Sequence, residues 1–174
     1  MPPSLARHLE SARLLLRQAT CADAEFILEL VNEPAWKEFI ADHGISTLED
    51  AIEYIKDKLL AMYQATGFGL WVVEKKDEHR PIGLCGLIKR DSLEHIDLGF
   101  AILSKYRNQG FAYEASAICL EYACRELRTQ TVLAIVAPSN TRSIRLLEKL
   151  KFRYNSEYLD PNSGAVLLLF KWHG

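Results

Sequence analysis

Apolar residues along this chain recur with two spacings, one typical of strands and one typical of helices. Short apolar runs bounded by turn residues predict seven strands, at 13–17, 68–75, 82–88, 96–103, 131–137, 152–158 and 166–170. Stretches with an apolar residue every three or four positions predict about four helices, at 20–31, 46–67, 113–127 and 141–150. The pattern therefore predicts the element order β-α-α-β-β-β-α-β-α-β-β.

The connections between these elements constrain how the strands pair. The strands at 68–75, 82–88 and 96–103 are joined by short turns, so we expect an antiparallel meander. The strand at 131–137 follows a helix, and a right-handed crossover places it parallel to 96–103. We therefore predict an α/β (α+β) fold with a mixed, mostly antiparallel seven-stranded sheet. The length of 174 residues fits a single domain over 1–174, with a flexible N-terminal segment at 1–11.

One strand–turn–helix stretch carries the most distinctive chemistry. The strand Asp97–Leu103 is apolar apart from its first residue, and it leads into a turn with the pattern Arg107-x-x-Gly110-x-Ala112. Small residues in such a turn let the backbone approach a ligand, and free N–H groups at the next helix start bind anions. The turn lacks the Gly-Lys-Ser/Thr of the kinase-type loop and the three glycines of the dinucleotide fingerprint. It predicts a phosphate-binding turn, although an ordinary strand-to-helix turn also favours glycine.

Composition and charge narrow the class of protein. A formal net charge of −2 argues against broad nucleic-acid binding, which needs a basic surface. No apolar run approaches the length of a membrane span, and residues 1–4 do not resemble the start of a secretory signal. The cysteines at 21, 85, 119 and 124 are too scattered for zinc ligands, and we expect buried thiols. We therefore expect a cytoplasmic protein without a metal and without nucleic-acid or membrane partners.

The phosphate-binding turn and the flanking motifs resemble a known family. Arg107-x-x-Gly110-x-Ala112 resembles the acetyl-CoA-binding pattern Arg/Gln-x-x-Gly-x-Gly/Ala of the GNAT acetyltransferases. Residues 97–100 with 110–115, and Asn140-x-x-Ser143 followed by 147–152, are similar to the RimJ/RimL branch of ribosomal-protein N-terminal acetyltransferases. The resemblance spans about residues 12–172. It implies the GNAT fold, with a splayed parallel pair of strands at its centre, and an acetyl-CoA-dependent N-acetyltransferase.

The resemblance also implies where acetyl-CoA binds. The pantetheine arm is expected to pair with the backbone of Ala101, Ile102 and Leu103. The pyrophosphate is expected on the backbone N–H groups of the turn, at Arg107, Asn108, Gln109, Gly110, Phe111 and Ala112. Asn140 is expected to hydrogen-bond the pantetheine, and the ribose phosphate is expected near the basic residues Arg142, Arg145 and Lys149. The alternative for these three basic residues is an ordinary solvated helix face.

Two catalytic side chains follow from the same resemblance. Many GNAT enzymes use a Tyr on the helix after Asn140 as general acid, but Leu147 stands at that position. The RimJ/RimL branch has a Ser at the position of Ser143, which is therefore expected to protonate the leaving CoA thiolate. Asp97 matches an acidic residue of the branch and is the candidate base, directly or through water. A purely structural role for either residue is left open, as are the alternative bases Glu74, Glu94 and His95.

The acceptor amine is constrained least. The resemblance to the RimJ/RimL branch implies a protein N-terminal α-amine as the first interpretation, and the pKa of about 8 of such an amine means that it needs little help to lose its proton. A small amine such as a polyamine, amino acid or antibiotic is the second, and a CoA-binding module without turnover is the third. Residues 33–44 and the hairpin around Asp160 are expected to line the acceptor groove, with Glu33, Glu38 and Asp42 as acids suited to a cationic acceptor.

The acetyl group is expected to pass directly to the amine within a ternary complex. A covalent route needs an activated nucleophile beside a base, and no Cys stands in a recognisable Cys/His arrangement. Whether the chain acts as a homodimer is left open.

Overall fold

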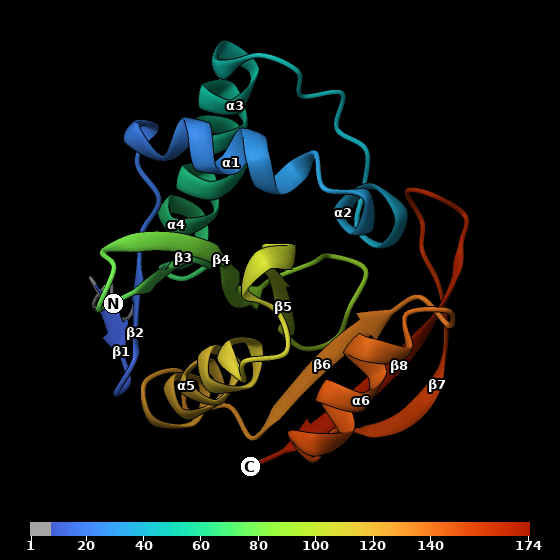
Figure 1. The fold of residues 1–174 in the computed structure, drawn as a ribbon. Helices are drawn as coiled ribbons and strands as arrows, with labels where there is room; N and C mark the ends of the chain where they lie inside the picture. Colours follow the sequence, from blue (N-terminus) through green and yellow to red (C-terminus); the bar gives the residue numbers. More distant parts are fainter. Residues whose placement is uncertain (1–7) are drawn as a thin grey trace.

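The computed structural model describes residues 8–174, and its centre is one mixed β-sheet (Figure 1). Eight strands lie in the order β1-β2-β3-β4-β5-β6-β8-β7, with β5 and β6 as the parallel pair. Their bounds are β1 His8–Glu10, β2 Leu14–Arg17, β3 Leu70–Lys75, β4 Arg80–Ile88, β5 Asp97–Ile102, β6 Thr131–Val136, β7 Arg153–Leu159 and β8 Val166–His173. The predicted fold class, with its mixed and mostly antiparallel sheet, is confirmed.

Helices cover both faces of this sheet (Figure 1). One face carries α1 Ala24–Val31, α2 Pro34–Phe39, α3 Leu48–Tyr54 and α4 Ala61–Thr66. A π-helical segment, Ile55–Leu60, joins α3 to α4 in one continuous helix. On the other face α5, Phe111–Arg125, packs against β4 and β5, and α6, Thr141–Lys149, packs against β6. Within residues 8–174 no helix combines the length and the apolar character needed to cross a membrane.

Two elements correct the sequence-based prediction. The sheet has eight strands rather than seven, because His8–Glu10 pairs antiparallel with β2. This strand lies in the segment 1–11 that the sequence predicts to be flexible, and residues 1–7 of that segment are outside the described part. The chain after Glu33, for which the sequence pattern predicts no helix or strand, forms α2, and Pro34 occupies its first turn, where a proline needs no N–H partner.

The two parallel strands separate after a single point of contact. Within the described chain, β5 and β6 are in register only at Asp97 and Leu133, and the Leu133 N–H donates to the Ile96 carbonyl over 2.9 Å. By contrast, β4 pairs along all of β5, and β8 pairs along all of β6. The gap between β5 and β6 therefore opens toward their carboxyl ends, where α5 and α6 are connected (Figure 1). The predicted splayed pair is confirmed.

A buried aromatic pair helps to fix α5 to the sheet. Trp71 of β3 is 1% exposed and meets Tyr122 of α5 edge to face, with ring centroids 5.3 Å apart. Such a pair contributes about 0.5–1.5 kcal/mol beyond its burial. Of the four cysteines that the sequence predicts to be buried, Cys85 and Cys119 are buried, Cys124 is partly buried and Cys21 is exposed.

Candidate functional site

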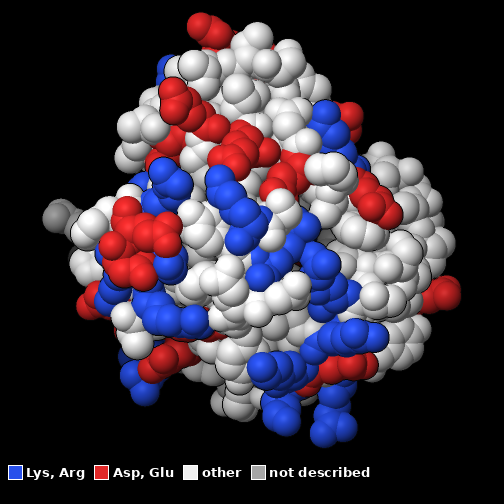
Figure 2. All heavy atoms as spheres, viewed as in Figure 1, with Lys and Arg blue, Asp and Glu red and all other residues white. Residues whose placement is uncertain are grey.

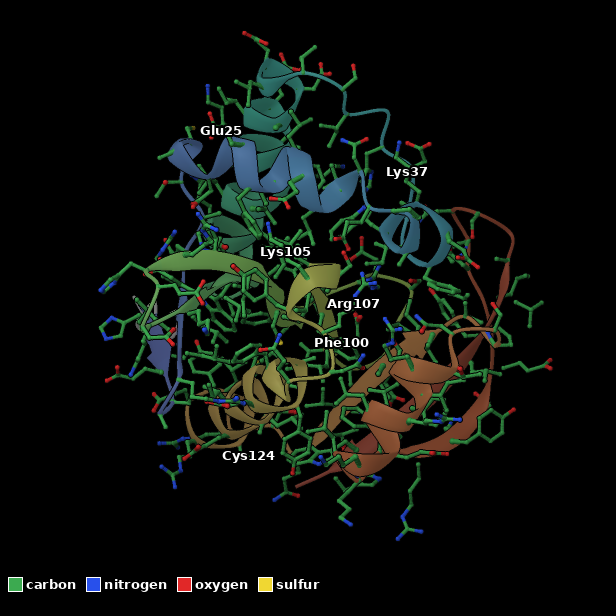
Figure 3. The ribbon with its side chains drawn as sticks, in the orientation of Figure 1. Glu25, Lys37, Phe100, Lys105, Arg107 and Cys124 are labelled. Carbon is green, nitrogen blue, oxygen red and sulfur yellow. The ribbon has the colours of Figure 1, made fainter. Side chains whose placement is uncertain are left out.

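A pocket of about 380 Å³ lies at the open end of the gap between β5 and β6. Its walls come from the α1–α2 segment, from the end of β5 with the turn that follows, and from the start of α6. The lining residues are Leu30, Glu33, Ala35, Trp36, Phe39, Ile40, Phe100, Ala101, Ile102, Arg107, Ala112, Ser139, Asn140, Thr141, Arg142, Ser143 and Leu146. Figure 3 shows Phe100 and Arg107 in the space between β5, β6 and α2. The fold thus brings the expected cofactor strand, turn and helix start to one cavity.

Strand β5 offers backbone groups to the pocket at alternate residues. The Leu103 N–H donates to the Ile82 carbonyl over 2.9 Å, and Ala101 is in register with β4. Because backbone groups alternate in direction along an antiparallel strand, those of Phe100 and Ile102 point into the gap. Of the three residues expected to pair with pantetheine, Ala101 and Leu103 therefore turn their backbone groups toward β4, and Ile102 faces the gap. Phe100 is the neighbouring partner that the resemblance did not supply.

The turn between β5 and α5 presents a row of backbone N–H groups. Asn108 and Gly110 take left-handed φ angles of +61° and +83°, and α5 begins at Phe111 without a capping side chain. Among the backbone hydrogen bonds that turns, loops and helix caps form within residues 8–174, none has an N–H group of residues 108–112 as its donor. Free N–H groups at a helix start, reinforced by the helix dipole, suit an anion such as a pyrophosphate. The Phe111 side chain is 3% exposed, so only its backbone can serve a ligand.

The Arg13 side chain contacts the residues of this turn and stabilises it. The sequence pattern did not indicate this role for Arg13. Its Nη1 donates to the Gln109 carbonyl over 3.1 Å, its Nη2 lies 2.6 Å from Glu114 Oε2, and its guanidinium lies 4.5 Å above the Phe111 ring. Burial raises the pKa of Glu114, but hydrogen bonds from Ser11 and Arg13 outweigh burial and hold that pKa below its usual value. No local pattern links residues 13 and 114, so only the fold reveals this support.

The Arg107 side chain is bound by the protein rather than free in the pocket. Its Nε donates to the Ile102 carbonyl over 3.0 Å, and its Nη2 lies 2.6 Å from Glu33 Oε2. Glu33 Oε1 accepts hydrogen bonds from the backbone N–H and the hydroxyl of Ser104, at 2.7 and 2.8 Å. Glu33, expected as an acid of the acceptor groove, therefore has both oxygens engaged and fastens α1–α2 to the turn.

The start of α6 supplies polar groups to the opposite wall. Asn140 is the N-cap, and its Oδ1 accepts from the backbone N–H of Ser143 over 3.2 Å. The hydroxyl of Ser143 makes no hydrogen bond within residues 8–174, and this residue lines the pocket half-buried. Arg142 lines the pocket, whereas Arg145 and Lys149 are not among the lining residues.

Asp97 is buried at the closed end of the gap and does not line the pocket. It is 1% exposed, and its Oδ1 accepts a hydrogen bond from Arg90 Nε over 2.9 Å. Burial raises the pKa of Asp97 to about 6, against the opposing influence of Arg90. A carboxyl group with this pKa is ionised at neutral pH and can accept a proton. The alternatives Glu74, Glu94 and His95 do not line the pocket either.

The α1–α2 segment forms an apolar wall of the pocket. Its lining side chains, apart from Glu33, are Leu30, Ala35, Trp36, Phe39 and Ile40. The expected acids Glu38 and Asp42 are not among the described lining residues, nor is any residue of the β7–β8 hairpin. Trp36 is 4% exposed, and its Nε1–H is buried without a partner in the described chain.

Basic side chains gather outside the turn. Figure 2 shows Lys and Arg side chains over the β5–α5 turn and α6, with acidic side chains next to them. Lys105, labelled in Figure 3, lies 2.8 Å from Glu29 of α1, and both are about half exposed, so this pair adds little stability. Such a surface attracts an anionic ligand. The part of the chain that the structure describes holds no cluster of His, Cys, Asp or Glu suited to a metal ion.

Known proteins resemble this chain in sequence and in fold. Residues 13–153 match the family described as an acetyltransferase (GNAT) domain. The uncharacterised N-acetyltransferase p20 of Bacillus licheniformis is 30% identical over 149 residues, which are 83% of this chain and 82% of p20. Mycobacterium smegmatis RimJ in complex with CoA-disulfide has a TM-score of 0.84 at 17% identity, covering 100% of this chain and 90% of RimJ. RimL, named as the ribosomal L7/L12 α-N-protein acetyltransferase, has a TM-score of 0.80 at 11% identity, covering 96% and 94% of the two chains.

Proposed function

The chain belongs to the GNAT acetyltransferase family, and from this premise we propose that it transfers an acetyl group from acetyl-CoA to a protein N-terminal α-amine. The observation that carries the proposal is that free β5 backbone, an anion-binding turn and the polar start of α6 meet in the same pocket. RimL shares the fold and is named as an acetyltransferase of a protein α-amine, which supports this choice of acceptor.

Three parts of the chain would hold acetyl-CoA, which supplies a thioester carbonyl that an amine can attack. The N–H groups of residues 108–112 would bind the pyrophosphate. The backbone of Phe100 and Ile102 would pair with the pantetheine arm, since the Ile102 carbonyl keeps one lone pair free beside its bond to Arg107. Asn140 and Arg142 would contact the arm and the phosphates from the α6 side.

The chemistry requires two proton movements and one electrostatic contact. Asp97 would accept the proton of the attacking amine through water, because it lies at the closed end of the gap and not in the pocket wall. The Phe100 N–H, which faces the gap, would donate to the oxygen that gains negative charge. Ser143, whose hydroxyl is free, would protonate the departing thiolate. No Cys or His is among the described lining residues, which favours direct transfer over an acetylated enzyme.

Replacing Asp97 by Asn should change the pH dependence of turnover. If Asp97 is the base, kcat/KM rises with pH through a pKa of about 6, because its carboxyl group must be ionised. The Asp97→Asn variant should lose this limb and follow only the ionisation of the amine, at about pH 8. Arg90→Gln removes a cation that lowers the pKa of Asp97, so it should move the limb to higher pH. An unchanged profile in Asp97→Asn would exclude Asp97 as the base.

The proposed function is tested by following thiol release from acetyl-CoA with a panel of amines. The panel pairs peptides that have a free N-terminus with the same peptides blocked by an acetyl group, and adds polyamines, free amino acids and aminoglycosides. We expect release with the free peptides alone, and mass spectrometry should place the acetyl group on the α-amine. Faster release with a small amine would overturn the protein acceptor, and binding of acetyl-CoA without any release would identify a CoA-binding module.

A further inference from the structure

We propose that the acceptor α-amine is borne by a residue with a bulky apolar side chain, which packs against the wall formed by α1 and α2. This inference rests on the proposed function and names the substrate class of the same pocket. It is carried by the shape and the charge of that wall.

The wall combines a fixed base with an exposed apolar edge. Leu30 and Trp36 are 1% and 4% exposed and are anchored in the core, so their surfaces toward the pocket are held in place. Phe39 is half-buried, and Ile40 is 50% exposed although it lines the pocket. An apolar side chain left half in water at a pocket is stabilised when an apolar ligand covers it. A ligand with a small or charged side chain would leave the apolar surface of Phe39 and Ile40 exposed to water.

The charges of the pocket disfavour a cationic acceptor. Its charged lining residues in the described chain are Glu33, Arg107 and Arg142. Both oxygens of Glu33 are engaged by Ser104 and Arg107, so the lining offers no free carboxylate and its net charge is positive. A polyamine or a lysine side chain would lose its hydration here without gaining a counter-ion from the protein lining.

Two sources share the required chemistry, an α-amine beside a bulky apolar side chain. One is the first residue of a protein, and the other is a free amino acid. The test therefore uses both. Four peptides that differ only in a first residue of Phe, Leu, Gly or Lys form one series, and free phenylalanine and glycine form the other.

The expected result is a preference set by the first side chain. With the parent protein, kcat/KM for the Phe and Leu peptides should exceed that for the Gly and Lys peptides at least tenfold, as apolar pockets commonly discriminate. Ile40→Asp should lower the ratio of Phe to Lys peptide at least tenfold, because it replaces apolar wall by a free carboxylate. Leu48→Asp is the matched control, since Leu48 is 41% exposed in the same helical layer but outside the pocket lining, and its ratio should equal that of the parent.

Each outcome decides the proposal. Equal kcat/KM for the four peptides, or a preference for Gly or Lys, overturns the apolar acceptor while amine acetylation stands. An unchanged ratio in Ile40→Asp overturns the role of the wall. If the enzyme acetylates free phenylalanine with a higher kcat/KM than free glycine and does not acetylate the peptides, the proposal is supported and the free amino acid is the source. Absence of thiol release with every amine overturns both this inference and the proposed function.

Discussion

A Gly110→Asp variant should lose most of its affinity for acetyl-CoA while keeping its fold. Gly110 has a φ of +83° and stands among the free N–H groups that are expected to bind the pyrophosphate. Aspartate would add a negative charge beside this anion, and like charges about 4 Å apart repel by about 4 kcal/mol at an effective dielectric constant of 20. A loss of roughly 2–4 kcal/mol corresponds to a Kd weakened about thirty- to thousand-fold, which calorimetry can measure.

A second glycine separates this charge effect from backbone strain. Gly164 in the β7–β8 hairpin has a φ of +70°, and a side chain there would meet nothing within 4 Å. Gly164→Asp adds the same charge and a similar strain, on the order of 1 kcal/mol, but lies outside the pocket lining. It should melt slightly earlier than the parent and bind acetyl-CoA equally well. A folded Gly110→Asp variant with the parent's affinity would show that the turn does not hold the pyrophosphate.

The elements that the sequence predicts best are those whose signal is local. The strand–turn–helix unit from β5 to α5 could be predicted because an apolar run, Gly110 and a helical period follow one another directly. Strand β1 could not, because His8–Glu10 has no apolar run and forms only by pairing with β2. The missed helix α2 did leave a signal. Trp36, Phe39 and Ile40 have helical spacing, and Pro34 stands at the start of this stretch, where a proline favours the beginning of a helix.

The site depends on contacts between distant residues, and these escape sequence reasoning. The direction of the β5 backbone is set by its register with β4, so the choice between Ile102 and Leu103 as pantetheine partners needed the fold. The same holds for ion pairs. Glu33 is separated from Arg107 by 74 positions, and only their contact shows that this acid is not free for a cationic acceptor.

The position of Leu147 in the core explains why Ser143, one helical turn earlier on α6, is expected to be the general acid. Many family members have a Tyr at this position, but here Leu147 is 1% exposed and belongs to the core beneath α6. Ser143 lies one turn closer to the helix start and lines the pocket, as does Leu146. Among the described lining residues, α6 contributes two hydroxyl groups. One belongs to its first residue, Thr141, and the other belongs to Ser143.

Replacing Ser143 by Ala should lower kcat about a hundredfold and change acetyl-CoA affinity little. A positioned general acid contributes roughly 10²–10⁴-fold to the rate, and the departing thiolate would otherwise have to leave unprotonated. The change should not disturb the fold, because Asn140 caps α6 through the backbone N–H of Ser143, which alanine retains. We expect the free energy of unfolding to change by less than about 0.5 kcal/mol. Steady-state kinetics at saturating acetyl-CoA, with calorimetric Kd values, separate the two effects.

Two further variants decide whether the hydroxyl itself is responsible. Ser143→Thr keeps a hydroxyl group and should retain more activity than Ser143→Ala, whereas a purely structural position would tolerate alanine at least as well. Ser156→Ala on β7 removes a serine hydroxyl outside the pocket lining, so its kcat should match that of the parent. If Ser143→Ala kept the parent's kcat, the thiolate would leave without help from this side chain. Acetyl transfer by the family fold would stand, because the acid only lowers a barrier that the bound thioester and a neutral amine can already cross.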